Sequence, residues 1–422
     1  MGERVTGSGG CIIKAGYRCY RKSESLNQGD ERMKEIVIDK PDKFHAETII
    51  VGGGVVGCAI AYELASRGQD VLLLERSAIA GGTSCAAAGM LAADSEDFAH
   101  PLMAKLARQS RQLLIEQQVL MATLSEVETG LQRQGFLTPF RSYRELSSYK
   151  DNRKSALSAS ADEVWWDRSV VQQEASWLNR DTYGAYYRPY ESEILPVHLT
   201  KAYAESAQAL GARVMEDIQD IRVQANELGV QGITTSIGEM RCKHVIIAAG
   251  LQSEELMRHV NLSMPVWSVK GEIAAVQFSD EHAGYRPDRT VYAEDIYIVP
   301  KANGEVWLGA TSLPGRTDLN VSVQGVQKLL TAATHWVPGM KEAQFMRAWA
   351  GVRPATPDGL PYIGACKSIP GLFAAFGHYR NGILLSAITG RLIAELLAGK
   401  SSEELGIEAL SPERLNRKGV VQ

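Results

Sequence analysis

Cysteine is scarce in this chain, with 6 among 422 residues, and no two of the cysteines form a CxxC pair. Histidine and cysteine do not group at the spacing of a zinc site either. A disulfide framework and a structural metal are therefore not expected. The absence of paired cysteines favours a reducing compartment, so we expect a cytoplasmic protein without a metal site.

Long apolar runs and an excess of one charge are also missing. The uncharged stretch from Thr48 to Tyr62 lies between Glu47 and Glu63, is rich in glycine, and is shorter than the roughly 20 residues that a membrane-crossing helix needs. The 45 basic and 49 acidic residues give a net charge of −4. Because recognition of nucleic acid usually shows as a basic excess or a basic face, we expect neither a membrane nor a nucleic acid as partner.

What is present indicates an ordinary globular protein of two or three domains, since 45% of the residues are apolar and 22% are charged. Residues 1–44 are different, because they mix charges with glycine and serine and have no sustained apolar period. Such a composition does not bury enough apolar surface to order itself. We therefore expect residues 1–44 to be a disordered extension outside the fold.

A strand, a glycine-rich turn, a helix and a second strand follow the extension. Residues 48–51 form a short β-branched run, which is typical of a strand buried on both faces. Residues 55–67 suit a helix packed on a sheet, Gly68 is placed to end it, and residues 71–74 resemble the first strand. The sequence predicts a βαβ unit here.

The turn of this unit carries a dinucleotide fingerprint. Gly52, Gly54 and Gly57 form a GxGxxG motif, with Val55 and Val56 opening the helix. The first glycine permits the tight turn, the second lets backbone approach a pyrophosphate, and the third lets the helix press on the strand. Glu75 ends the second strand, where it can accept hydrogen bonds from ribose hydroxyls and disfavours NADP. FAD and NAD both remain possible from this motif, and the small residues of segment 81–90 favour FAD.

The rest of the chain alternates helical and strand-like patterns. Helices are expected around 101–127, 150–177, 198–210 and 383–397, strands at 218–223, 229–235, 245–249 and 372–376, and an antiparallel sheet from the alternation in 265–278 and 292–310. This order predicts a nucleotide domain assembled from separate segments, with a substrate domain inserted between them.

Five segments together resemble the FAD-dependent amine oxidase family of D-amino-acid and sarcosine oxidases. They are IVGGGVVG (50–57), TSCAAAGM (83–90), AEDIYIVP (293–300), WAGVRP with PDGLPYIG (349–354 and 357–364) and GHYRNGILL (377–385). Within the family the likeness is to the glycine oxidases of the thiamine pathway, and it runs from about Glu47 to the C-terminus.

The resemblance implies a mixed α/β and α+β fold of the glutathione-reductase type. A Rossmann-like FAD-binding domain would comprise residues 45–96, 190–260 and 350–415, and an antiparallel-sheet substrate domain residues 97–189 and 261–349. It further implies oxidation of glycine, sarcosine and small D-amino acids by oxygen to an imine, with hydrogen peroxide released and the glycine imine used for thiazole synthesis. The family often assembles as tetramers, so a homotetramer is expected. Relatives with a tethered flavin have a cysteine where this chain has Gly351, so FAD should be bound non-covalently.

The resemblance also assigns site residues one by one. The ADP half of FAD would be bound by Gly52 to Gly57, Glu75 and Arg76, and the pyrophosphate and ring would be lined by Thr83, Ser84, Ala88, Gly89 and Met90. Backbone at the pyrimidine end of the flavin would come from His378, Tyr379, Arg380, Asn381, Gly382, Ile383 and Leu384. The substrate would be faced by Arg353, Arg380 and Tyr297. His378 is expected to pack beside the flavin and not to act as a base.

Physical reasoning supports Arg353 as a ligand for a carboxylate. A small amino acid offers almost no apolar surface, so a bidentate arginine is the strongest directional partner available to it. On the residues alone, a surface or inter-domain salt bridge is the favoured role of Arg353, Tyr297 could be a core tyrosine, and Arg380 could lie on a surface loop. Two departures from some glycine oxidases concern the substrate side, where Asp295 stands in place of a histidine and Ser312 in place of a methionine.

Two other functions stay open from the sequence. One is a D-amino-acid dehydrogenase or sarcosine-type enzyme of the same fold, which would pass electrons to a quinone or demethylate N-methyl amines. The other is a nucleotide-binding protein without turnover, such as a partner in flavin-dependent tRNA modification. The first predicts a membrane anchor and the second predicts a basic face without a substrate cluster.

Overall fold

The computed structural model of the chain describes residues 11–14, 18–21, 35–36, 45–98, 100–154 and 162–415. Its contacts divide the chain into two units, Met1–His45 and Ala46–Gln422. In the first unit the short strands β1 (Cys11–Lys14), β2 (Arg18–Arg21) and β3 (Glu35–Ile36) pair as an antiparallel sheet. These strands lie within the segment expected to be disordered, and the rest of residues 1–44 lies outside the described residues.

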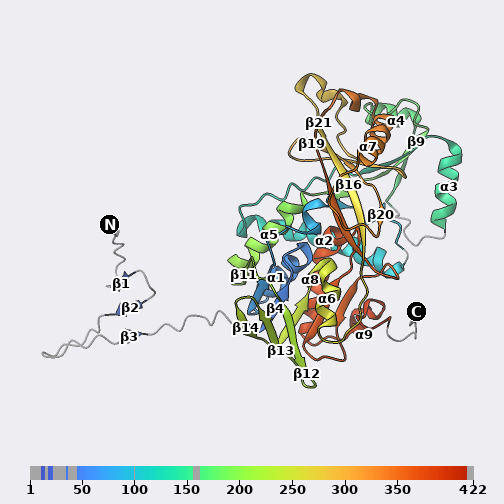
Figure 1. Cartoon of the computed structure of the whole chain (residues 1–422). Coiled ribbons are helices and arrows are strands. Elements are labelled where there is room, and N and C mark those ends of the chain that lie inside the picture. The colour runs from blue at the N-terminus through green and yellow to red at the C-terminus, as the bar shows by residue number, and fades with distance from the viewer. Residues whose placement is uncertain are drawn as a thin grey trace, which may run out of the picture. The chain divides into compact units, whose positions relative to one another are not determined.

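A six-stranded sheet forms the middle layer of one half of the second unit (Figure 1). Its order is β11 (Arg213–Met215), β5 (Val71–Leu74), β4 (Thr48–Val51), β15 (His244–Ile247), β23 (Leu372–Phe376) and β22 (Tyr362–Ala365). The neighbours are parallel except for the antiparallel β22–β23 edge. This is the expected Rossmann-like sheet, and its strands come from distant parts of the sequence.

Both faces of this sheet are covered, which explains why its central strands β4, β5 and β15 are almost entirely apolar. Alternate side chains of β5 enter two separate cores: Val71 and Leu73 one of them, Leu72 and Leu74 the other. The first core is completed by the helices α1 (Val55–Ser66), α2 (Pro101–Leu124), α5 (Pro196–Ala209) and α8 (Gly382–Leu397). The second is completed by the strands β12 (Arg222–Asn226), β13 (Gly229–Thr235) and β14 (Gly238–Arg241) and by α6 (Ser253–Arg258).

Helix α2 follows the expected domain boundary at residue 97, but it packs on helices of the FAD-binding domain. Its buried residues Met103, Leu106 and Leu113 share a core with α1 and α8 of the nucleotide domain. This packing attaches α2 to the FAD-binding half, although the expected boundary assigns it to the substrate half. The domain boundaries stay predictions.

A second, mostly antiparallel sheet forms the other half of the unit. Its order is β20 (Leu313–Pro314), β16 (Trp267–Gln277), β19 (Glu305–Gly309), β18 (Tyr297–Pro300), β17 (Thr290–Tyr292), β7 (Phe136–Phe140), β9 (Gly184–Arg188) and β8 (Val164–Asp167), and β21 (Gln344–Ala355) pairs with β16. Helix α7 (Val323–Trp336) packs on this sheet and buries Trp336. The long pair β16–β21 runs from this sheet towards the first one, as Figure 1 shows.

Short elements complete the unit. They include the 3-10 helix η1 (Thr83–Ala86), the strand pair β6 (Met90–Leu91) and β10 (Ser192–Glu193), and the helices α3 (Tyr143–Lys154), α4 (Arg168–Glu174) and α9 (Ser402–Leu405).

Two sequence predictions are wrong. Where a helix is expected at 150–177, the structure has the end of α3, the strand β8 and the short α4. The Trp166 ring stacks on the ring of Tyr187 in β9 with the centroids 4.6 Å apart, and this contact favours the pairing of β8 with β9. The strand expected at 218–223 begins only at Arg222, since Asp217 and Asp220 have positive φ angles of 59° and 53° that interrupt an extended chain.

Candidate active site

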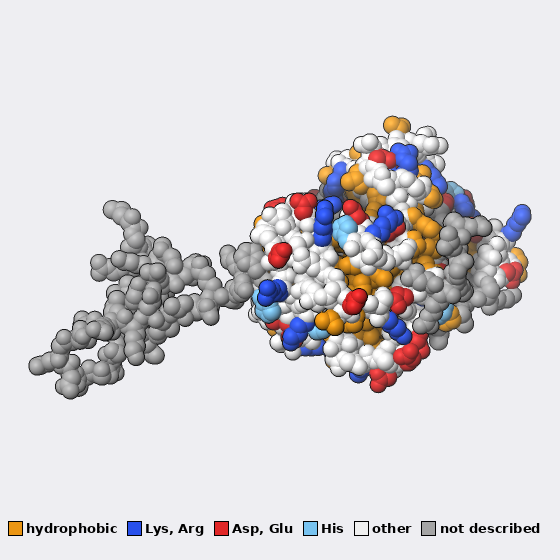
Figure 2. All heavy atoms as spheres, turned by 60° about the horizontal axis from the view of Figure 1, so that its bottom comes forward, with side chains coloured by type: hydrophobic (Ala, Val, Ile, Leu, Met, Phe, Trp, Pro, Cys, Tyr) orange, Lys and Arg blue, Asp and Glu red, His pale blue; other side chains and the backbone are white. Residues whose placement is uncertain are grey.

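A cavity of about 720 Å³ lies between the carboxyl ends of the first sheet and the strand β21. Its wall includes the fingerprint loop, η1, the stretch after β15 and the stretch after β23. Ligands of doubly wound sheets bind at this edge, outside the carboxyl ends of the strands. Figure 2 shows hydrophobic side chains gathered in a band across the middle of the visible face of the molecule.

The fingerprint glycines are required by their surroundings. Gly52 has a φ of +117°, and a Cβ there would lie 2.6 Å from the carbonyl oxygen of Ala248. A Cβ on Gly57 would overlap the carbonyl oxygen of Gly52. Gly54 is different, because the nearest atom to its Cβ would be Ser84 Oγ at 3.3 Å. Gly54 therefore keeps open the space in front of helix α1.

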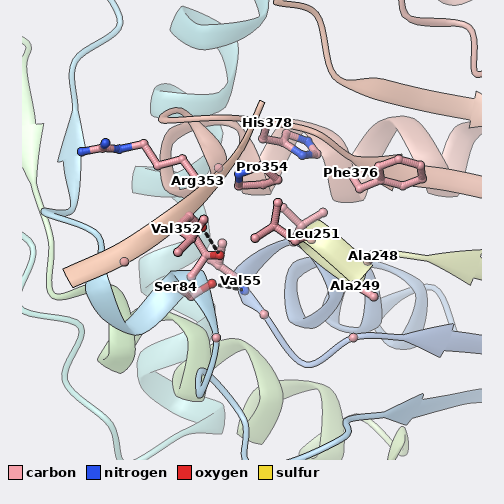
Figure 3. Close-up of a pocket in the computed structure, with 18 of the residues that line it drawn as sticks. Val55, Ser84, Ala248, Ala249, Leu251, Val352, Arg353, Pro354, Phe376 and His378 are labelled. Carbon is pink, nitrogen blue, oxygen red and sulfur yellow. Dashed lines mark hydrogen bonds between the residues drawn. The ribbon is translucent and has the colours of Figure 1, made fainter. Parts of the chain in front are cut away.

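Glu75 and Ser84 hold the backbone of this loop. The Gly53 N–H donates to Glu75 Oε2 at 2.6 Å, and the Ser77 N–H donates to Glu75 Oε1 at 2.9 Å. The Val55 N–H, at the start of α1, donates to Ser84 Oγ at 3.0 Å, which Figure 3 shows. Glu75 and Arg76 line the cavity together with Gly52, Gly54, Val55 and Val56.

The segment from Thr83 to Met90 lies against strand β21. Thr83 Oγ1 donates to the carbonyl oxygen of Val352 at 2.8 Å, and Trp349 Nε1 donates to the carbonyl oxygen of Ala86 at 3.3 Å. Gly351 faces Ala86 so closely that a Cβ on it would overlap the Ala86 methyl group. All the expected residues of this segment line the cavity, namely Thr83, Ser84, Ala88, Gly89 and Met90.

The stretch after β23 lines the opposite wall, with His378, Tyr379, Arg380, Asn381, Gly382 and Ile383. The His378 ring lies beside Pro354 in Figure 3, and its Nε2 is 3.0 Å from Thr389 Oγ1. Burial lowers the pKa of His378 to about 4, so the ring is neutral at pH 7. Leu384 is not part of the wall, because it is 1% exposed and packs in the core formed by α1 and α8.

Arg353 extends from β21 to the side opposite Val352 and Pro354, as the alternation of a strand requires (Figure 3). Its Nη1 donates to the carbonyl oxygen of Thr311 at 3.3 Å, and it forms no ion pair with a carboxylate of the described residues. A Cβ on Gly271 would overlap its guanidinium, so a glycine is needed beneath it. A salt-bridge role for Arg353 is thus unsupported.

Tyr297 lies next to Arg353 on the same cavity wall. Gly309, its partner in the β18–β19 ladder, leaves room for the phenol ring. Burial raises the pKa of Tyr297, while the positive charges of Arg353 and Arg380 act in the opposite direction. The phenol therefore remains a neutral hydrogen-bond donor at neutral pH.

Arg380 belongs to a cluster with two residues that the sequence did not reveal. Its Nε is 3.2 Å from Glu96 Oε1, and its Nη2 donates to the Tyr292 hydroxyl oxygen at 3.2 Å. The Tyr292 hydroxyl in turn donates to Glu96 Oε1 at 2.8 Å. The Glu96 carboxylate, 7% exposed, raises the pKa of Arg380 and keeps it charged.

The stretch after β15 is also part of the wall and was missed. Ala248, Ala249, Gly250 and Leu251 follow the strand directly, and Ile218 to Arg222 lie nearby on the same wall. The sequence could have indicated Ala248, Ala249 and Gly250, because they are small residues at the carboxyl end of a predicted parallel strand, where ligands bind.

The two departures from the glycine oxidase pattern do not enter the cavity wall. Asp295 accepts a hydrogen bond from Trp336 Nε1 at 2.9 Å and lies 3.7 Å from Arg141 Nη1. Ser312 is exposed. Neither residue is among those that line the cavity.

Comparison with known proteins agrees with this geometry. Residues 47–396 match the family DAO, FAD dependent oxidoreductase. The chain belongs to this family. A glycine oxidase from Geobacillus kaustophilus is 34% identical over 84% of this chain and 94% of its own length. A bifunctional protein ThiO/ThiG from a Nostoc species is 32% identical over 85% of this chain and 54% of its own.

A solved structure shares the fold. The crystal structure of glycine oxidase from Geobacillus kaustophilus superposes with a TM-score of 0.81 at 33% identity, covering 88% of this oxidoreductase and 99% of that chain. The expected fold class and the expected FAD are thereby confirmed. Within the described residues no helix is long and apolar enough to cross a membrane, and no group of three metal-ligating side chains could hold a metal ion.

A buried carboxylate behind the cavity gives a prediction on stability. Glu191 is 0% exposed, its Oε1 accepts from the Asp94 and Ser95 N–H groups at 2.5 and 3.0 Å, and no described group donates to its Oε2. Burial raises its pKa from 4.5 to about 7. The folded state therefore holds a proton that the unfolded state releases, so this contribution to stability is full below pH 4.5 and is lost as the pH rises through about 7.

We expect Glu191→Gln to gain about 3 kcal/mol relative to the unsubstituted protein between pH 4.5 and 8. Urea unfolding of both proteins across this range measures the difference. Glu281→Gln, which removes an exposed carboxylate, is the matched control and should follow the unsubstituted protein. Parallel curves for Glu191→Gln and the unsubstituted protein would contradict the assignment.

Proposed function

We propose that this oxidoreductase catalyses the FAD-dependent oxidation of glycine and small amines, including sarcosine and small D-amino acids. The products are the imine or 2-oxo acid, ammonia and hydrogen peroxide, and the glycine imine serves thiamine thiazole synthesis. The observation that carries the proposal is Arg353, a guanidinium that has no anionic partner among the described residues and lines the cavity beside the half-buried Tyr297. A carboxylate is the ligand such a pair lacks.

The residues present fit FAD. The open space in front of Gly54 leads to the N-terminus of α1, where the backbone N–H groups of the first turn and the helix dipole favour a pyrophosphate. Glu75 stands at the end of β5, where the ribose hydroxyls would lie. When bound, FAD supplies the two-electron oxidation of the amine and passes the electrons to oxygen.

The contact between Gly351 and Ala86 supports non-covalent binding. A cysteine at position 351 would overlap the Ala86 methyl group, so the chain has neither the thiol nor the space for a flavin link at this point. Cys366, the nearest cysteine in sequence, is 2% exposed and acts as a small core residue.

The protein groups have separate roles in this proposal. Arg353 and Tyr297 hold the substrate carboxylate, and Arg380 closes the far side of the pocket. The residues from His378 to Ile383 form the wall at the pyrimidine end, and His378, neutral at pH 7, packs there without exchanging a proton. The chain's contribution to the reaction is orientation of the α-carbon and exclusion of water.

We further propose oxygen as the electron acceptor and a homotetramer, as the glycine oxidase pattern implies, and a cytoplasmic location, which the scarce and unpaired cysteines favour. The sequence identities of 34% and 33% to glycine oxidases favour oxygen as the electron acceptor over the quinone of the dehydrogenase alternative.

The visible spectrum of the purified protein tests the proposal. We expect the flavin band to bleach anaerobically with glycine, sarcosine, D-alanine or D-proline, and peroxide to form when air is admitted. A yellow protein that none of these amines bleaches would reject the substrate and keep the FAD assignment. Reduction by an amine without peroxide in air would favour the dehydrogenase.

A further inference from the structure

We propose that Glu96 is a specificity-determining residue, which pairs with Arg380 and thereby restricts the pocket to substrates with one carboxylate. The inference rests on the proposed function and names a residue that determines its substrate class. It starts from two arginines that line one cavity but have different partners.

Arg353 and Arg380 differ in how their charges are balanced. The Arg353 guanidinium donates to the carbonyl oxygen of Thr311 at 3.3 Å and contacts the neutral Tyr297 phenol. It pairs with no carboxylate of the described residues, so it is the cation that a substrate anion can neutralise. Arg380 Nε lies 3.2 Å from Glu96 Oε1, and its Nη2 reaches the Tyr292 hydroxyl oxygen at 3.2 Å. A second carboxylate would therefore meet an arginine that is already paired, with Glu96 beside it.

The structure holds Glu96 firmly in this position. The Glu96 N–H donates to the carbonyl oxygen of Ala92 at 3.1 Å, which closes the turn that follows β6. In the same turn Asp94 pairs with Arg108 at 2.6 Å and with Arg111 at 2.7 Å, both from α2. Glu191 fixes the turn from the other side by accepting from the Asp94 and Ser95 N–H groups.

Tyr292 completes the cluster from the second sheet. Its hydroxyl donates to Glu96 at 2.8 Å and accepts from Arg380, so it bridges the two charges. The cluster joins three elements, namely the turn after β6, the end of β17 and the stretch after β23. Because three anchored elements hold it, Arg380 is not free to turn towards a second carboxylate without losing two partners.

Replacement of Glu96 by a neutral residue should widen the substrate class. With Glu96→Gln the carboxylate becomes a neutral amide of the same shape, and Arg380 is left as a second unpaired cation in the pocket. Dicarboxylates such as malonate, and amine substrates with two carboxylates such as iminodiacetate, should then bind through Arg353 and Arg380 together.

Equilibrium binding to the oxidised holoenzyme tests this prediction. Acetate and malonate are titrated at pH 7.5, and the change in flavin absorption gives a dissociation constant for each. We expect Glu96→Gln to shift the ratio of the two constants at least tenfold in favour of malonate. Tyr292→Phe should shift it in the same direction but less, and Glu96→Asp should stay near the unsubstituted protein.

Glu294→Gln is the matched control, because it removes one negative charge from the exposed turn between β17 and β18 without changing the cavity wall. Its ratio should equal that of the unsubstituted protein. An unchanged ratio in Glu96→Gln, or an equal loss of affinity for both anions, would overturn the proposal. Peroxide formation with iminodiacetate against glycine is the second readout and should move with the ratio.

The experiment separates this inference from the proposed function. If glycine fails to reduce the flavin of the unsubstituted protein, the proposed function is rejected. The malonate-to-acetate ratio still reports on Glu96 in that case, since it measures the binding of anions and not turnover.

Discussion

Gly54→Leu is expected to give a folded protein that loses most of its yellow colour because it binds FAD much more weakly. The backbone at Gly54 has φ −75° and ψ 175°, which any residue adopts, so the substitution adds no backbone strain. A Cβ there meets only Ser84 Oγ, at 3.3 Å, and the rest of the leucine side chain then occupies the space in front of α1. Overpacking of about 3 kcal/mol at this point corresponds to a loss of roughly 100-fold in affinity for FAD.

The flavin absorption relative to that of the protein, measured with added FAD, tests the prediction, and circular dichroism reports the fold. Gly284→Leu is the matched control, since a Cβ at Gly284 meets nothing within 4 Å and this residue does not line the cavity. It should remain yellow. A Gly54→Leu protein that retains its full flavin would show that the pyrophosphate lies elsewhere.

The βαβ unit could be predicted because its pattern is local. A buried strand, a glycine-rich tight turn, a helix ended by Gly68 and a second buried strand follow one another directly in the sequence. The structure places β4, α1 and β5 at the predicted positions. The segment 150–177 could not be predicted in this way. Trp166 belongs to a strand because of Tyr187 on β9, and such long-range partners are invisible in the local sequence.

The same distinction separates the site residues. The glycines of the fingerprint, Glu75 and the segment from Thr83 to Met90 lie in contiguous motifs, and the structure brings them to one cavity. Glu96 and Tyr292 are 196 residues apart, and no motif connects them. Only the folding of the turn after β6 against the end of β17 brings these two side chains together beside Arg380.

Leu384 shows the limit of carrying a motif over as a block. The motif GHYRNGILL runs from a loop into helix α8, and a helix turns its side chains through 100° per residue. The residues up to Ile383 line the cavity, whereas Leu384 turns into the core. A contiguous motif therefore places its residues near a site without deciding which of them line it.

Arg353→Ala should weaken binding of the substrate and leave FAD in place. A charge-assisted hydrogen-bonded pair contributes about 1.5–3 kcal/mol, which corresponds to a rise of roughly 10- to 150-fold in the KM for glycine and in the dissociation constant of acetate. FAD should stay bound because the Arg353 side chain points away from Val352, Pro354 and the start of α1, as Figure 3 shows.

Arg347→Ala is the matched control on the same strand. Arg347 is paired with Glu305, at 2.8 Å from Nη2 to Oε2, and does not line the cavity, so its loss should leave both constants unchanged. Loss of flavin from Arg353→Ala alone would mean that Arg353 supports the FAD site. An unchanged affinity for acetate would move the carboxylate to Arg380, which would first have to leave Glu96. Arg353 is the expected ligand because it alone of the two arginines can bind an anion without losing one.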